Sequence, residues 1–182
     1  MRGAGQDPWQ GRGPMLKPIF AAVLAVALIT TTGVRADDDE ALTTFKVMTP
    51  ATALELAQAT LADCRKRGFQ VAVSVVDRFG VLQVTLRDRY AGAHTPEMAR
   101  RKAWTAVSFR TDTQTMMEET QADKHQSGVR HLPGTIMVGG GVPVEAAGST
   151  VGGVGVSGAP GGDQDDLCAR AGIEAIADKL AF

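Results

Sequence analysis

Two short apolar segments in the middle of the chain are separated by only three residues. Residues 70–77 and 81–87 are rich in Val and Leu, and the turn Arg78-Phe79-Gly80 lies between them. Runs of this length and composition, bounded by a glycine turn, are typical of β-strands. A three-residue connection is too short for the crossover that parallel strands need. The sequence therefore predicts a β-hairpin, and with it an antiparallel sheet.

The rest of the pattern alternates helical and extended segments. Further strands are predicted at residues 135–138, 142–145 and 150–156, and helices at about 49–67, 95–109, 111–123 and 163–180. Short turns between the strands, with helices segregated to the faces of the sheet, indicate a single-domain α+β fold.

The first predicted helix has an apolar stripe. Its buried face is expected to carry Leu54, Ala57, Leu61 and Cys64, because these residues recur at helical spacing. By contrast, residues 124–134 are polar, and we predict an irregular segment there.

The N-terminal part has the layout of a secretory signal peptide. A positive start from about Met15 precedes an uninterrupted apolar run at residues 19–29, and small residues lead to Ala36. We expect residues 1–36 to be a leader that is cleaved after Ala36, which predicts a periplasmic or secreted protein. The alternative is a retained membrane anchor, which the short apolar run disfavours. No permanent anchor is therefore expected.

The processed chain is expected to begin with a flexible segment at residues 37–48, ahead of a domain at 49–182. Residues 1–14 fit neither a signal peptide nor a fold, so Met15 competes with Met1 as the true start.

Residues 1–36 hold four of the 19 basic and one of the 20 acidic residues, so the remainder carries a formal charge of about −4. Binding to a phosphate backbone needs a basic face, and nucleic acid is therefore not an expected partner.

The chain has two cysteines, which lie on the apolar stripes of two predicted helices. Cys64 is late in the first helix and Cys168 is early in the last. If these helices pack antiparallel, both sulfurs come to the same end, and an oxidising compartment would let them pair. The alternative is two buried free thiols that act as small hydrophobic side chains.

Four ordered motifs give the chain a family resemblance. Residues 71–80, 99–106, 139–143 and 155–163 read VAVSVVDRFG, ARRKAWTA, GGGVP and GVSGAPGGD. In this order and at these separations they resemble the GlcG/HbpS family, over about residues 49–182. The resemblance implies a profilin-like arrangement of the α+β domain, frequent homo-oligomers and members that bind haem. The same family includes the C-terminal domain of PduO-type proteins.

Haem binding requires an apolar slot, an axial donor for the iron and cations for the propionates. Four residues around the predicted helix at 95–109 have i, i+4, i+7 and i+11 spacing and are predicted to share one stripe. They are His94, Met98, Arg101 and Thr105, with Lys102 beside them. The alternative is that His94 is a surface loop residue and that Arg101 and Lys102 form a solvated charged face.

A second candidate axial ligand borders the Gly-rich segment. It is His131, with Arg130 as a partner for a propionate. The third histidine, His125, lies in the polar segment and is expected to be solvated.

Enzymatic motifs are incomplete in this sequence. Gly139-Gly140-Gly141 lacks the Lys-Ser/Thr pair of a phosphate-binding loop, and residues 155–159 miss the last glycine of a nucleophile elbow. We therefore predict a non-enzymatic, exported protein that binds haem or a related tetrapyrrole for capture, buffering or sensing. The alternative is an oligomeric accessory protein of a periplasmic system that has no tetrapyrrole ligand.

Overall fold

A computed structural model describes residues 41–181, so the predicted leader and its cleavage site lie outside the described residues. From Thr44 onward the described chain belongs to one compact unit. The elements follow one another as α1 (Pro50–Lys66), β1 (Ala72–Asp77), β2 (Leu82–Arg87), α2 (Thr95–Phe109), α3 (Thr113–Glu119), a 3₁₀ helix (Ser127–His131), β3 (Gly141–Ala146), β4 (Ser149–Ser157), α4 (Gly162–Glu174) and α5 (Ala177–Leu180).

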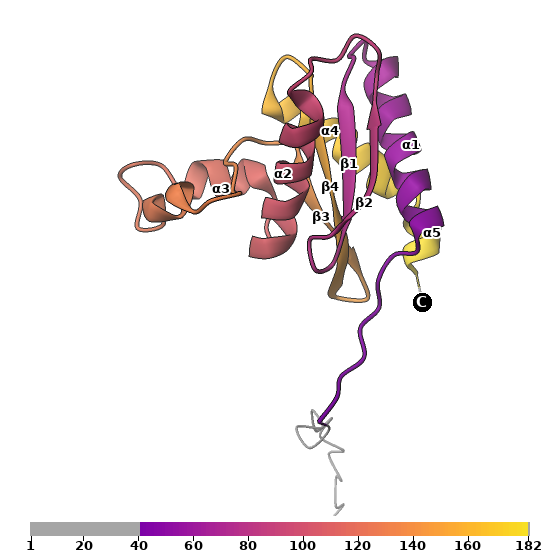
Figure 1. Ribbon diagram of the computed structural model, residues 1–182, viewed down its shortest axis with the longest axis horizontal. Coiled ribbons are helices and arrows are strands. Elements are labelled where there is room, and N and C mark those ends of the chain that lie inside the picture. The colour runs from indigo at the N-terminus through magenta and orange to yellow at the C-terminus, as the bar shows by residue number, and fades with distance from the viewer. Residues whose placement is uncertain (1–40, 182) are drawn as a thin grey trace, which may run out of the picture. The chain divides into compact units, whose positions relative to one another are not determined.

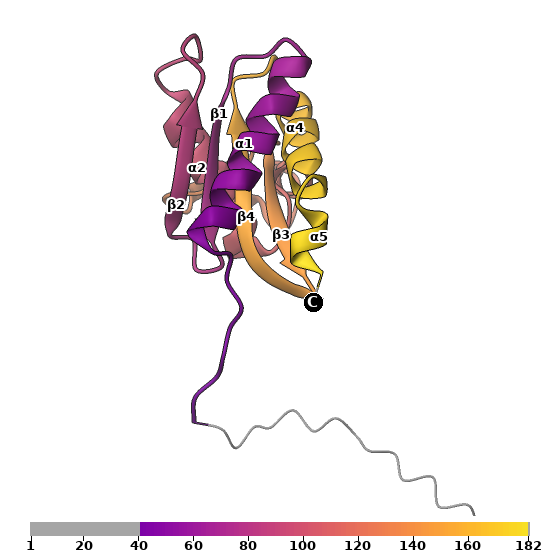
Figure 2. The same cartoon turned by 90° about the vertical axis from the view of Figure 1, so that its right-hand side faces the viewer.

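The described strands form one antiparallel sheet with the order β2-β1-β4-β3. Figure 1 and Figure 2 show α1, α4 and α5 on one face of this sheet and α2 on the other. The predicted hairpin is β1–β2, in which Val75 pairs with Val84. The predicted α+β class with an antiparallel sheet flanked by helices is confirmed. None of the helices within residues 41–181 combines the length and apolar character needed to cross a bilayer.

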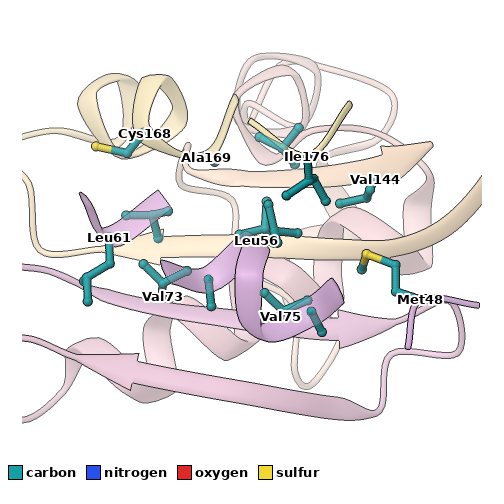
Figure 3. Packing of buried hydrophobic residues seen from close by; sticks show 14 of the residues in the cluster. Met48, Leu56, Leu61, Val73, Val75, Val144, Cys168, Ala169 and Ile176 are labelled. Carbon is teal, nitrogen blue, oxygen red and sulfur yellow. The ribbon is translucent and has the colours of Figure 1, made fainter. Parts of the chain in front are cut away.

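The main core lies between the sheet and the layer of α1 and α4 (Figure 3). Successive side chains of a β-strand point to opposite faces of the sheet, so β1 contributes residues to the packing on both faces. Val73 and Val75 join the main core, whereas Val76 packs with residues of α2 in a smaller cluster.

The buried face of α1 differs in one position from the predicted stripe. Ala57, Leu61 and Cys64 are buried, but Leu54 is 40% exposed, and Leu56 takes its place with no exposed surface. Leu54 lies at the edge of the stripe, where helical spacing alone does not decide which side chain faces the sheet.

The predicted strand at residues 135–138 is wrong. These residues lie outside the sheet, beside α2. Their polar groups are satisfied by side chains of that helix: Ile136 N–H donates to Thr105 Oγ1 (3.0 Å), and Thr135 O accepts from Arg101 Nη2 (2.6 Å). Hydrogen bonds to side chains thus satisfy these backbone groups, which in a strand would bond to the backbone of a neighbouring strand.

The other differences concern helix ends. The predicted helix at 111–123 is shorter and ends at Glu119, while the segment predicted to be irregular contains the 3₁₀ helix. The last predicted helix is divided into α4 and α5 around Ile176, whose side chain is buried in the core.

The helix α2 lies unusually close to β4 because glycine leaves room for it. A Cβ placed at Gly155 would lie 2.0 Å from Ala99 O and 2.7 Å from Ala103 N. The contact is with helix backbone, which cannot rotate away as a side chain can. Close approach of another backbone is one of the uses of glycine inside a strand.

We expect Gly155→Ala to lower the free energy of unfolding by about 1–3 kcal/mol, the usual range for overpacking. Urea unfolding followed by circular dichroism measures the change. Gly128→Ala is the matched control, because a Cβ there would meet nothing within 4 Å. Equal unfolding midpoints for the two variants would contradict the close contact.

The two cysteines are joined in a buried disulfide that links α1 to α4, with Cα atoms 5.3 Å apart. Cys64 lies near the end of α1 and Cys168 at the middle of α4. The disulfide therefore cross-links the two helices that cover the main core.

Candidate functional site

The candidate haem stripe lies on α2, and His94 belongs to it. His94 is the residue before the helix, yet its backbone has right-handed helical angles (φ −78°, ψ −21°). Its carbonyl accepts a hydrogen bond from Met98 N–H (3.1 Å), as in a helical turn. Because the spiral of the helix extends back to His94, the predicted i, i+4, i+7 geometry applies to it.

Two members of the stripe hold a neighbouring segment against α2. Arg101 donates to Gly134 O (Nε, 3.3 Å) and to Thr135 O (Nη2, 2.6 Å). Thr105 is buried and accepts from Ile136 N–H. Both residues therefore have structural partners. The guanidinium has five N–H donors, so the two bonds to Gly134 and Thr135 leave donors for an anionic group.

The imidazole of His94 is exposed and rests on Gly92. A Cβ placed at Gly92 would lie 2.7 Å from His94 Cε1 and 2.9 Å from Nδ1. The carbonyl oxygen of Gly92 also accepts two hydrogen bonds from Thr95, one from the backbone N–H (3.0 Å) and one from the side-chain hydroxyl (2.8 Å). The turn before α2 therefore seats the imidazole on a residue that has no side chain.

Arg130 is not brought to the stripe. Its Nη2 donates to Met117 O (2.6 Å), and its Nε donates to Thr120 O, so it satisfies carbonyls at the end of α3. Figure 1 shows α3 projecting away from the sheet. His131 is exposed. Gly134, three residues later in the chain, accepts a hydrogen bond from Arg101 through its carbonyl. His125 is exposed too.

Lys102, predicted as a cation for haem propionates, is instead committed inside the protein. Only 1% of its surface is exposed, and its Nζ donates to Asp165 Oδ2 (2.7 Å) and to Val156 O (2.9 Å). Asp165 Oδ1 accepts in turn from Ala159 N–H (3.0 Å). The pair ties α2 to the end of β4 and to the start of α4.

Sequence reasoning missed the partner of Lys102, although a signal was present. Lys102 lies on the same helical face as Ala99, Ala103 and Ala106, all of which are buried. A charged residue on such a face needs a buried counter-ion. The counter-ion itself, Asp165, is 63 residues away in the chain, so no local pattern connects it to Lys102.

The surface members of the stripe, His94, Met98 and Arg101, are not enclosed by a large hollow of the described chain. A hollow of about 570 Å³ lies elsewhere, between the end of α2, the edge strand β3 and α4, and none of the candidate haem residues lines it. His94 and His131 are both exposed, and Met98 and Arg101 are half-buried. This hollow is therefore not the predicted apolar slot. The stripe instead offers an imidazole, a thioether and a guanidinium at the surface of α2.

These features define a class: a small α+β domain with a four-stranded antiparallel sheet, a helix set on glycines of its inner strand, and a stripe of potential haem-binding side chains on that helix. A family model described as "Haem degrading protein HbpS-like" matches residues 48–174. The chain therefore belongs to the HbpS-like family, which confirms the resemblance seen in the motifs.

Solved structures agree with this assignment. A double mutant of HbpS from Streptomyces reticuli is 39% identical, with a TM-score of 0.70 over 74% of this chain and 90% of that chain. A structure of PduOC in complex with haem is 32% identical, with a TM-score of 0.68 over 71% of this chain and 95% of that one. The protein ORFY of Klebsiella pneumoniae is 27% identical, with a TM-score of 0.73 over 76% and 96% of the two chains.

A curated relative is the corrinoid adenosyltransferase PduO of Salmonella typhimurium. It is 34% identical over 124 residues, which are 67% of this chain but only 37% of that protein. The chain thus spans little more than a third of the length of this relative.

Proposed function

We propose that this protein is exported and binds haem, which it captures, buffers or senses outside the cytoplasm. Three observations support the proposal: membership of the HbpS-like family, the similarity to the PduOC domain solved with haem, and the stripe on α2. The observation that carries it is the exposed imidazole of His94 on the same helical face as Arg101. Export rests on the signal-peptide layout of residues 1–36.

The chemistry of the stripe fits haem. A haem iron takes an imidazole as an axial ligand, and its propionates pair with cations. His94 and Arg101 are seven residues apart, which is about 10 Å along a helix at 1.5 Å per residue. The two residues are therefore about two turns apart on one face, where one side chain can face the iron and the other a propionate. Met98 lies between the two and supplies an apolar surface for the ring.

We propose binding rather than turnover. The stripe itself offers one imidazole, one thioether and a guanidinium that is hydrogen-bonded to backbone carbonyls. This set can hold a ligand, but it lacks the base and nucleophile pair of a covalent catalyst. The adenosyltransferase named for PduO is more than twice as long as the matched region.

We expect haemin to give a shifted Soret band with the wild-type protein, and His94→Ala to weaken binding about tenfold or more, equivalent to about 1.4 kcal/mol. Gly92→Ala should weaken binding as well, because a Cβ at this position displaces the imidazole while leaving it in the chain. The ring is at the end of a side chain and can move, so this variant should keep its fold. Absorbance titration of the purified protein measures both effects.

His125→Ala is the matched control, since it removes an exposed histidine remote in sequence from the stripe. Loss of binding in His131→Ala, with no effect of His94→Ala, would move the axial ligand to His131. A wild-type spectrum identical to that of free haemin would contradict haem binding and favour the accessory-protein alternative. A Soret band that the protein bleaches with turnover would contradict a purely binding role.

A further inference from the structure

The open hollow beside β3 is not used by the proposed haem site. It has a volume of about 570 Å³ and is lined by the end of α2, the edge strand β3 and α4. Volumes of this order are typical of sites for small molecules. Val142, Pro143 and Ile173 give the hollow an apolar part, and its charged residues are Arg110, Asp112, Glu145, Arg170 and Glu174. A ligand for this hollow is therefore small, partly apolar and charged.

Arg110, the residue after α2, has a backbone conformation that normally belongs to glycine. Its φ of 52° and ψ of 39° lie in the left-handed region, where a Cβ approaches the following carbonyl oxygen. The N–H of Arg110 donates to Val107 O (3.3 Å) and that of Thr111 to Ala106 O (3.1 Å), which is the pattern of a Schellman motif. Among the described residues with positive φ, only Arg110 and Ala147 are not glycine. The sequence therefore keeps an arginine where glycine would stabilise the end of the helix.

The side chain of Arg110 has no structural role that would explain this choice. Within residues 41–181 its guanidinium forms no hydrogen bond or ion pair. The second arginine of the hollow, Arg170, is held in place from α4: its Nε lies 2.6 Å from Asp166 Oδ2 and its Nη2 3.4 Å from Asp112 Oδ2. Residues with side chains in the left-handed region cluster at sites that hold ligands. We therefore looked for a ligand that the free guanidinium of Arg110 can bind.

The free charges of the hollow have both signs. Glu145 of β3 and Glu174 of α4 are exposed and, like Arg110, form no ion pair within the described part of the chain. In all, two arginines face three carboxylates in the lining, and Asp166 behind Arg170 adds a fourth. A simple anion would be repelled by this net negative charge. The ligand must bring one carboxylate for Arg110 and a cationic group for each of the two free glutamates.

We propose that this hollow binds a free amino acid with a cationic side chain, such as arginine or lysine. The α-carboxylate of the ligand pairs with the guanidinium of Arg110, a geometry that allows two parallel hydrogen bonds. Its α-ammonium and its side-chain cation pair with Glu145 and Glu174, and its methylene groups lie on the apolar part of the hollow. A peptide that ends in such a residue offers the same carboxylate and side chain. However, its α-nitrogen is an uncharged amide, so the free amino acid matches two glutamates better.

The test is an NMR titration of the purified protein in the absence of haem, so that its outcome does not depend on the proposed function. We expect L-arginine to shift the amides of Thr111 and Glu174 with a Kd below about 1 mM. L-Citrulline lacks the side-chain charge and should bind about two- to fivefold more weakly, and L-argininamide lacks the carboxylate and should bind about tenfold more weakly. No shift at about 10 mM arginine would overturn the proposal. Tighter binding of the dipeptide glycyl-arginine than of arginine would also overturn it and assign the hollow to a peptide C-terminus.

Arg110→Gly should weaken arginine binding about tenfold and yet raise the thermal midpoint by about 1–3 °C, because glycine adopts the left-handed conformation without strain. Ala147→Gly is the matched control: it relieves the other non-glycine residue with positive φ (47°), which lies outside the hollow, and should gain stability with unchanged binding. Glu174→Gln should weaken binding about two- to fivefold. Unchanged binding in Arg110→Gly would overturn the proposal. So would a midpoint that falls in Arg110→Gly and rises in Ala147→Gly, because the arginine side chain would then serve the fold itself.

Discussion

Lys102→Met is expected to lower the free energy of unfolding by about 3–5 kcal/mol, the range found when one partner of a buried ion pair is removed. The substitution leaves the Asp165 carboxylate buried, with Ala159 N–H as its remaining hydrogen-bond donor. Burial lowers the pKa of Lys102 and raises that of Asp165, while the attraction between the two groups opposes both shifts. An unpaired carboxylate at this position would lose that compensation.

Two further variants separate the ion pair from simple packing. Lys102→Met/Asp165→Leu removes both charges, and it should regain a large part of the lost stability because a buried pair replaced by apolar groups is often neutral. Lys66→Met, at an exposed lysine of α1, is the control and should change stability by less than about 0.5 kcal/mol. If urea unfolding gave the same loss for the single and the double variant, the pairing of the charges would not be the source of the stability.

Replacing Cys64 and Cys168 together by alanine should lower the free energy of unfolding by about 2–5 kcal/mol. The disulfide closes a loop with a sequence separation of 104 residues. The chain-entropy model assigns about 4.7 kcal/mol to a loop of 100 residues, because the cross-link restricts the unfolded chain. Unfolding of the oxidised wild type and of the double variant, in the same denaturant series, measures the difference.

A reducing agent provides the internal control for this prediction. It should destabilise the wild type to about the level of the double variant and leave the double variant unchanged. A wild type that does not respond to reductant, with a mass greater by two hydrogens, would mean that the cysteines are free thiols. The two cysteines would then act only as small buried hydrophobic side chains.

Both predictions concern the attachment of α4. The Lys102–Asp165 pair joins its first turn to α2, on the opposite face of the sheet, and the disulfide joins it to α1. Since α4 covers the main core, loosening either link should expose that core first on the side of α4. Hydrogen exchange of the α4 amides can follow this local opening.

Local features of the sequence determined the class of fold. The three-residue turn after residue 77 required an antiparallel hairpin, which is β1–β2. The helix predicted at about 95–109 is α2, which runs over Thr95–Phe109. These signals depend on backbone geometry within a few residues, which is why they can be read without knowledge of the partners.

The candidate site was only partly predictable, because its residues have partners far away in the chain. The stripe from His94 to Thr105 follows from helical spacing and is present on α2. However, the seat of His94 on Gly92 and the capping of α3 by Arg130 depend on how loops return to the helices. No spacing rule gives these contacts.

The sequence by itself determined the antiparallel α+β architecture and the helix that carries the haem candidates, since hydrophobic period and turn chemistry act locally. Only the tertiary structure decided the rest. It joined Cys64 to Cys168, buried Lys102 against a carboxylate 63 residues away, and placed residues 135–138 on α2 instead of in the sheet. The physical reason is that a buried charge, thiol or peptide group takes whichever partner the packed chain brings within bonding distance.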